Sequence, residues 1–132
     1  MTLSAADRLD ILDVIGRADA AATRRDADAY ASLFTDDAVL DGTQGRHTGT
    51  AALRSSVSPI WAAEGLTTWH LTLNPLVDPG DGPDEAVARS VLLIVDPAPP
   101  ITIRTAAAIT QTLRRTSDGW RISRRTVAAA PS

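Results

Sequence analysis

The stretch ITIRTAAAITQTLRRTSDGWRISRRTV, residues 101–127, predicts two long β-strands joined by a tight turn. From residue 66 onward the periodicity of the chain is strand-like rather than helical. Asp118-Gly119 is a dipeptide typical of short hairpin turns. We therefore expect one strand over residues 101–116 and a second over residues 120–127, paired as a hairpin.

Two further strands precede this hairpin. Residues 67–77 and 85–95 have strand-like periodicity, and the cluster DPGDGP at residues 78–83 between them has the composition of a turn. The later half of 85–95 is apolar on both faces, which predicts burial on both sides. Because few connections are long enough for helical crossovers, these strands should form an antiparallel meander.

The N-terminal segment has a helical pattern. Over residues 4–24 the apolar side chains fall on one broad arc, and charged side chains fall on the opposite side. Ser4 is a suitable N-cap, and Asp7 in the first turn suits the positive end of the helix dipole. We therefore expect one long helix at the start of the chain.

Shorter elements follow this helix. Asp26 should cap a second, short helix, and a third helix is expected over residues 50–63, with Pro59 kinking it or ending it early. Between these two helices we expect a short strand at residues 38–40 and a turn at residues 41–45.

The order of these elements predicts an α+β fold, in which helices cover one face of an antiparallel sheet. The other face is apolar enough in the middle strands to predict a partner sheet, and hence a homodimer. The length of 132 residues suits a single domain over residues 1–132.

Composition excludes several classes of function. The chain has no cysteine and only two histidines, which are far apart in the sequence, so we expect no metal site. It has no lysine, which excludes Schiff-base chemistry on a lysine side chain. The net charge of −3 argues against nucleic acid as a partner. We find no membrane-spanning run and no signal-peptide pattern, and therefore expect a cytoplasmic protein without a membrane partner.

The chain contains four further informative segments, in this order: LFTDDAV at 33–39, GRHTG at 45–49, HLTLNP at 70–75 and LRRTSDGWRI at 113–122. Together they resemble the SnoaL-like branch of the nuclear transport factor 2-like superfamily. The resemblance implies a cone-shaped, curved antiparallel sheet wrapped around N-terminal helices, a cystatin-like α+β barrel that encloses a mostly apolar pocket. Relatives include polyketide cyclases, scytalone dehydratase and ketosteroid isomerase, which implies acid/base chemistry on a small hydrophobic ligand without a cofactor.

His70 is the first catalytic candidate. Its position resembles that of the histidine that acts as general acid/base in the family. The pKa of an imidazole needs little change for it to act near neutral pH. The alternation of residues points the other way, because Trp69, Leu71 and Leu73 form the apolar side of the strand and place His70 away from the core. A bulge near Asn74-Pro75, or a polar-lined pocket, would reconcile the two interpretations.

Asp19 is the second catalytic candidate. It projects into the apolar arc of the first helix, one turn before Thr23, which resembles the position of an aspartate in scytalone-dehydratase-like relatives. An apolar surrounding would raise the pKa of its carboxyl group toward a useful range. The alternative is a half-exposed aspartate that pairs with Arg8 or Arg104.

Six residues are predicted to bind the substrate, namely Gln111, Thr23, Asp41, Tyr30, Trp69 and Asn74. Gln111 lies on the apolar side of its strand, so its amide either lines the pocket or belongs to a structural network. Asp41 has an alternative role as a turn residue, and Tyr30 as a core residue with a satisfied hydroxyl group.

The remaining aromatic residues and the second histidine have simpler interpretations. Trp69 and Trp61 could stack on a planar ligand, whereas Trp120 is expected in the core. His47 lies in a polar, glycine-flanked segment and is expected to be exposed.

Two functions remain open on the sequence. The first is a cofactor-independent cyclase, dehydratase or isomerase that acts on a polyketide- or terpenoid-like molecule, with His70 and Asp19 as acid/base groups. The second is a non-catalytic dimeric protein that binds a hydrophobic ligand, because Ile109 and Gln111 stand where relatives often carry acidic or phenolic groups.

Overall fold

The computed structural model describes residues 3–129, which include three helices, the third of which follows the first two strands. Helix α1 spans Ala5–Arg24, α2 spans Ala27–Ala31 and α3 spans Thr50–Glu64. Ser4 and Asp7 cap α1 reciprocally: the Ser4 hydroxyl accepts from the Asp7 N–H at 3.0 Å, and the Asp7 carboxylate accepts from the Ser4 N–H at 3.1 Å. The expectation that Pro59 ends α3 early is wrong. The helix continues to Glu64, and its buried side chains on both sides of the proline hold it in the core.

Six strands form one sheet, in the order β2-β1-β6-β5-β4-β3. Their bounds are β1 Phe34–Gly42, β2 Gly45–Thr48, β3 Trp69–Pro79, β4 Glu85–Asp96, β5 Thr102–Thr116 and β6 Gly119–Ala129. The α+β class is confirmed, with a curved sheet that remains unclosed.

Two details of the sheet differ from the prediction. All neighbouring strands are antiparallel except β1 and β6, which run parallel. This pair is separated by most of the chain, so no tight turn constrains its direction. The predicted short strand at 38–40 is part of the longer β1, which pairs with β2 from Val39 to Gly42 and so includes part of the segment 41–45 that was expected to form only a turn.

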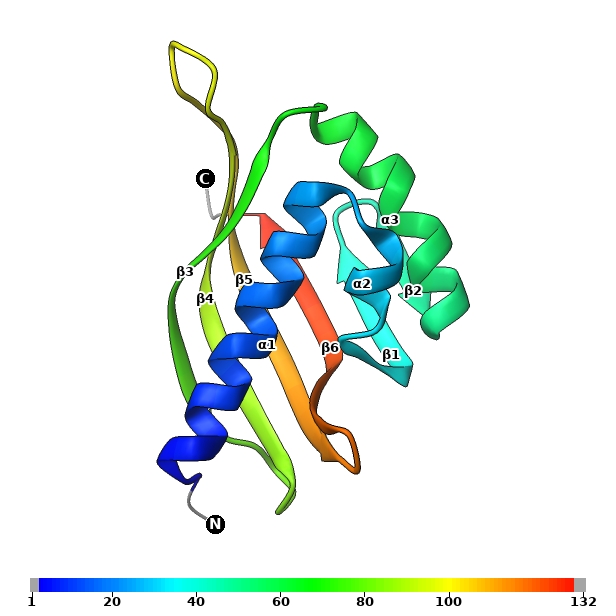
Figure 1. Ribbon diagram of the computed structural model, residues 1–132, viewed down its shortest axis with the longest axis vertical. Helices are drawn as coiled ribbons and strands as arrows, with labels where there is room; N and C mark the ends of the chain where they lie inside the picture. Colours follow the sequence, from blue (N-terminus) through cyan, green and yellow to red (C-terminus); the bar gives the residue numbers. More distant parts are fainter. Residues whose placement is uncertain (1–2, 130–132) are drawn as a thin grey trace.

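The core lies between the helices and one face of the sheet. Helix α1 crosses this face, and α2 and α3 lie beside it near β1 and β2 (Figure 1). Ile11 and Ile15 of α1 are buried, as are Leu113 of β5 and Ile122 of β6. Within the described residues, no helix has both the length and the apolarity needed to cross a membrane.

Side chains of α1 bind the free edge of β3, which has β4 as its only neighbour in the sheet. The bonded pairs are Arg8 with the Val77 carbonyl, Asp19 with Thr72, and Thr23 with the His70 N–H. Arg8 and Asp19 are separated by about three helical turns and Thr23 follows about one turn later, so all three project from the same side of α1. The edge strand is therefore tied to the helix along much of its length.

The other face of the sheet carries exposed apolar side chains. Trp69, Leu73, Val91 and Ile103 are 51, 38, 46 and 59% exposed. Leu73 pairs in register with Val91 across β3 and β4, and Val95, the partner of Trp69, also pairs with Ile103 of β5. The apolar side of β3 therefore faces outward, which contradicts the prediction that it faces the core.

Candidate functional site

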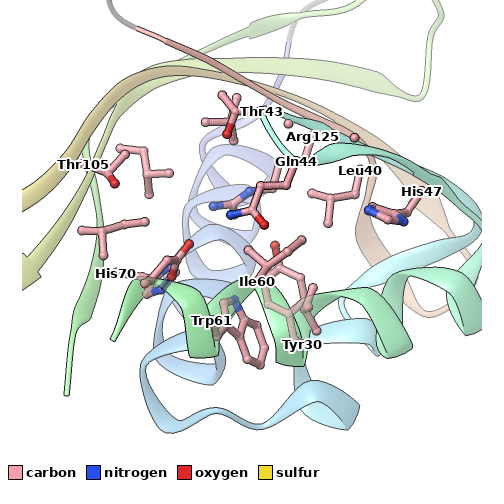
Figure 2. A pocket seen from close by; sticks show the side chains of 17 residues that line it. Tyr30, Leu40, Thr43, Gln44, His47, Ile60, Trp61, His70, Thr105 and Arg125 are labelled. Carbon is pink, nitrogen blue, oxygen red and sulfur yellow. Dashed lines mark ion pairs between the residues drawn. The ribbon is translucent and has the colours of Figure 1, made fainter. Parts of the chain in front are cut away.

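A cavity of about 150 Å³ opens between the helices and the sheet. In Figure 2, Tyr30, Trp61 and His70 lie on the helical side of this cavity, and Thr43 and Gln44 of the β1–β2 turn lie across from them. The remaining lining is mostly aliphatic, from Leu40, Val57, Ile60, Leu92, Ile94 and Val127. The cavity is thus apolar with a few polar groups, as is typical of small-molecule sites.

His70 and Glu64 form a buried pair on the cavity wall. Nε2 of His70 lies 2.8 Å from Oε2 of Glu64, and their side chains are only 4 and 16% exposed. Apart from this contact, neither atom has a hydrogen-bond partner among the described residues. The contact is within hydrogen-bond distance, but its angles are not those of a well-directed hydrogen bond.

Local structure explains how Glu64 reaches His70. Helix α3 ends at Glu64, and Gly65 follows with φ 119°, a conformation that favours glycine. The Arg25 guanidinium donates to the Gly65 carbonyl at 2.6 Å and to the Thr68 hydroxyl at 2.7 Å. Arg25 therefore fixes the connection between α3 and β3, and with it the position of the carboxylate relative to the imidazole.

Arg125 is a buried cation on the same cavity wall. It is 5% exposed, and its guanidinium carbon lies 5.9 Å from the centre of the Tyr30 ring. Within residues 3–129, no hydrogen bond and no carboxylate at ion-pair distance is found for its guanidinium. Sequence reasoning missed this residue.

A bulge in β6 explains why Arg125 faces inward. Leu113 pairs with Ile122, whereas the preceding Thr112 pairs with Arg124, so Ser123 is an extra residue in β6. The Ser123 hydroxyl donates to the Thr112 carbonyl at 3.2 Å. Beyond the bulge the alternation is shifted by one residue, which turns Arg125 toward the interior and Arg124 toward solvent.

Two aromatic residues pack beside the polar groups. The rings of Tyr30 and Trp61 meet edge to face, with centroids 5.2 Å apart, and Trp61 meets His70 in the same way at 6.4 Å. Burial raises the pKa of the Tyr30 phenol, which therefore stays neutral. A neutral hydroxyl group beside the cavity can donate a hydrogen bond to a bound oxygen.

Asp19 and Thr23, by contrast, do not line the cavity. Asp19 accepts from the Thr72 N–H at 2.9 Å and from its hydroxyl at 3.0 Å, and the Thr23 hydroxyl accepts from the His70 N–H at 3.0 Å. Burial raises the pKa of the Asp19 carboxyl group as expected, although the charge of Arg125 and the bonds from Thr72 oppose this rise. The alternative of an ion pair with Arg8 or Arg104 is not observed either.

The other predicted binding residues lie in different places. Gln111 is fully buried on β5, but it is not part of the lining, and neither amide atom has a partner among the described residues. Asp41 also lies outside the lining and pairs with Arg46 at 3.0 Å, which lowers the pKa of its carboxyl group. Trp69 projects from the outer face, where it cannot stack on a ligand in this cavity.

Asn74 and His47 complete the comparison with the sequence. Asn74 is exposed in a bulge of β3, with φ 52°, and does not line the cavity. This bulge lies where the sequence analysis placed one, and it allows both His70 and Val77 to face inward. His47 is part of the cavity lining, so the expectation that it is simply exposed is wrong.

The comparisons with known proteins agree with this fold. A protein of unknown function with a cystatin-like fold from Nostoc punctiforme is 24% identical, with a TM-score of 0.90 over 100% of this chain and 97% of its own. A nuclear transport factor 2-like protein from Novosphingobium aromaticivorans is 25% identical, with a TM-score of 0.82 over 96% and 83%. A protein from Streptomyces avermitilis, proposed to be a dehydratase of the same family, is 16% identical, with a TM-score of 0.82 over 98% and 100%.

Among curated proteins, none matches the chain. The family model for the SnoaL-like domain matches residues 4–126, nearly the whole described chain. The resemblance inferred from the sequence is therefore confirmed, and the chain belongs to the SnoaL-like domain family.

Proposed function

We propose that this protein is a cofactor-independent acid/base enzyme, a cyclase, dehydratase or isomerase, that acts on a small hydrophobic molecule. The observation that carries this proposal is the buried pair of His70 and Glu64 on the wall of an apolar cavity. An imidazole beside a carboxylate can take a substrate proton as general base, because the carboxylate stabilises the imidazolium that forms. Glu64 takes the partner role that the sequence analysis gave to Asp19.

The cavity also limits the size of the substrate. A cavity of about 150 Å³ holds a molecule the size of benzene. The substrate class supported by this volume is therefore smaller than a polycyclic polyketide, and a single-ring terpenoid or polyketide fragment fits it. Enolisation, double-bond migration and elimination of water all need only a proton acceptor, a proton donor and an oxygen ligand in such a site.

Exchange of substrate protons with solvent tests the proposal without knowledge of the natural substrate. The protein is incubated in D₂O with cyclohexanone and with 3-cyclohexen-1-one, and NMR follows deuterium uptake next to the carbonyl group and migration of the double bond. His70→Gln should slow both reactions about 100-fold or more, since one acid/base group contributes about 10²–10⁴-fold. Glu64→Gln should slow them less, because the imidazole remains.

Glu85→Gln is the matched control, because Glu85 lies outside the cavity and, among the described residues, its carboxylate accepts a hydrogen bond only from the N–H of Asp81. It should leave the rates unchanged. Binding of these ketones without any exchange above the buffer rate would favour the binding-protein alternative. Exchange that persists in His70→Gln would remove His70 from the mechanism.

The proposal includes a homodimer formed through the outer face of the sheet. Support comes from the exposed apolar side chains of β3, β4 and β5, which are aligned in register. A contiguous apolar surface of this kind is typical of protein interfaces. The cavity opens on the opposite, helical side of the sheet, so this dimer would leave access to the cavity unchanged.

A further inference from the structure

Arg125 is a buried cation that forms no direct ion pair within the described part of the protein, although its charge opposes the rise in the pKa of the Asp19 carboxyl group. Its side chain is almost completely buried. Among residues 3–129, no carboxylate lies within ion-pair distance of the guanidinium. A buried lysine could lower this cost by losing its proton, but a guanidinium stays charged in proteins. Buried charges are paired or hydrogen-bonded as a rule, so the missing partner needs an explanation.

The carboxylates near the cavity are already engaged. Both oxygens of Asp19 accept from Thr72, and Glu64 contacts His70. The Tyr30 ring contacts the guanidinium through its face and brings no full negative charge. The remaining direction is the cavity itself, whose wall includes Arg125.

We propose that Arg125 binds a carboxylate of the substrate, so that this site takes a one-ring carboxylic acid. A single guanidinium matches a planar carboxylate, which it can hold through two parallel hydrogen bonds. A phosphate dianion carries a second negative charge, whereas Arg125 is the one arginine in the described cavity lining. The volume holds about one small ring, with the carboxylate at the cavity wall beside Arg125.

This inference rests on the proposed function and names the substrate class for the same cavity. Because Arg125 and His70 both line the cavity, an acid held by Arg125 would leave its ring beside the imidazole. The guanidinium would then select and orient the substrate, while His70 would move the proton. The two roles predict different effects of substitution.

Binding of simple acids and their neutral amides tests the inference. Calorimetry on the full chain compares benzoate with benzamide, and cyclohexanecarboxylate with cyclohexanecarboxamide. At least one acid should bind about 10- to 100-fold more tightly than its amide, the range expected for hydrogen bonds to a charged group. Arg125→Gln should remove this preference, and Arg125→Lys should retain part of it, since it keeps the charge but loses the planar fork.

Arg124→Gln is the matched control. It removes one positive charge from the adjacent position of β6, but Arg124 faces solvent and pairs with Asp41 at 3.4 Å. The preference for the acid should survive in this variant. Equal binding of acids and amides by the unsubstituted protein, absence of acid binding, or an unchanged preference in Arg125→Gln would each overturn the inference. If circular dichroism shows that Arg125→Gln is unfolded, the acid-to-amide ratio of the unsubstituted protein and of Arg125→Lys decides.

His70→Gln separates this inference from the proposed function. It should slow proton exchange about 100-fold or more and still bind the acid. Retained exchange in His70→Gln would refute the acid/base role while leaving the carboxylate site intact. If the unsubstituted protein binds acids no more tightly than their amides, the carboxylate site is refuted and the acid/base role remains intact.

Discussion

Replacement of Asp19 by alanine should destabilise the fold even though its carboxylate does not line the cavity. The substitution removes two hydrogen bonds to Thr72, at 2.9 and 3.0 Å, and leaves the Thr72 N–H without its partner at the edge of β3. An unsatisfied, partly buried group costs about 1–3 kcal/mol. Alanine recovers up to about 0.7 kcal/mol in helix propensity, so the net loss should be about 1–2 kcal/mol.

Urea unfolding at pH 7 measures this loss directly, and thermal unfolding should show a decrease in Tm of roughly 4–7 °C for a chain of 132 residues. Asp19→Asn keeps an acceptor and adds a donor, so its loss should be smaller. Asp13→Ala is the control on the same helix, because Asp13 forms only an exposed ion pair with Arg17 at 2.7 Å. That pair should contribute about 0.5 kcal/mol or less.

The stability difference between Asp19→Asn and the unsubstituted protein should change with pH in a definite direction. Burial raises the pKa of Asp19 above 3.8, so the folded state holds the proton more tightly than the unfolded state. Stability that depends on the protonated form is therefore lost as pH rises from about 4 through the folded-state pKa. Asp19→Asn should gain relative to the unsubstituted protein between pH 4 and pH 7. The structural role of Asp19 would be refuted if Asp19→Ala and Asp13→Ala lowered the free energy of unfolding equally. It would also be refuted if the stability difference between Asp19→Asn and the unsubstituted protein did not change with pH.

Two further predictions concern assembly and acid stability. The double variant with Leu73→Glu and Val91→Glu should be a monomer in light scattering, because both side chains lie on the proposed dimer face. Leu9→Glu, on the exposed side of α1, should remain a dimer. An unchanged mass in the double variant would exclude this face as the interface. Asp7 has a pKa far below 3.8, chiefly because Arg115 donates to it at 2.8 Å. Its contribution should be complete above that unfolded-state value and lost as pH falls below it. Asp7→Asn should therefore lower Tm by a larger amount at pH 7 than at pH 3, where part of the contribution is already lost, and an equal decrease at both would contradict this assignment.

The parts of the fold that local signals control could be predicted from the sequence. Ser4 with Asp7 predicts the start of α1, and Asp118-Gly119 predicts the β5–β6 hairpin. The extent of β1 could not be predicted in this way, because its strand structure depends on pairing with β2 on one side and with the distant β6 on the other. Pairing between segments so far apart leaves no local sequence pattern.

The candidate site was harder to predict, because two bulges change which side chains face inward. Strict alternation would bury Arg124 rather than Arg125. One signal was available. Ile122 and Val127 are both apolar, but they lie five positions apart, so a regular strand would place them on opposite faces. If both side chains face the core, the strand must contain an extra residue. Glu64 was missed because the expected helix ended one residue earlier, at 63.

For His70, the alternation of β3 was read correctly but assigned to the wrong sides of the sheet. The usual rule assumes that the apolar side of a strand faces the protein's own core. In β3 the polar side faces α1 and the cavity, where Asp19 and Thr23 provide partners for backbone groups. The apolar side instead faces outward, at Trp69 and Leu73.

The bonds between α1 and β3 also affect how the protein avoids aggregation. An edge strand with free N–H groups is a template on which another chain can add a strand. Here side chains of α1 occupy the N–H groups of His70 and Thr72, so an incoming strand would first have to displace the helix. The opposite edge is β2, which has only four residues and offers a short template. Fibril-like growth from the folded state is therefore disfavoured at both ends of the sheet, although one of its faces is markedly apolar.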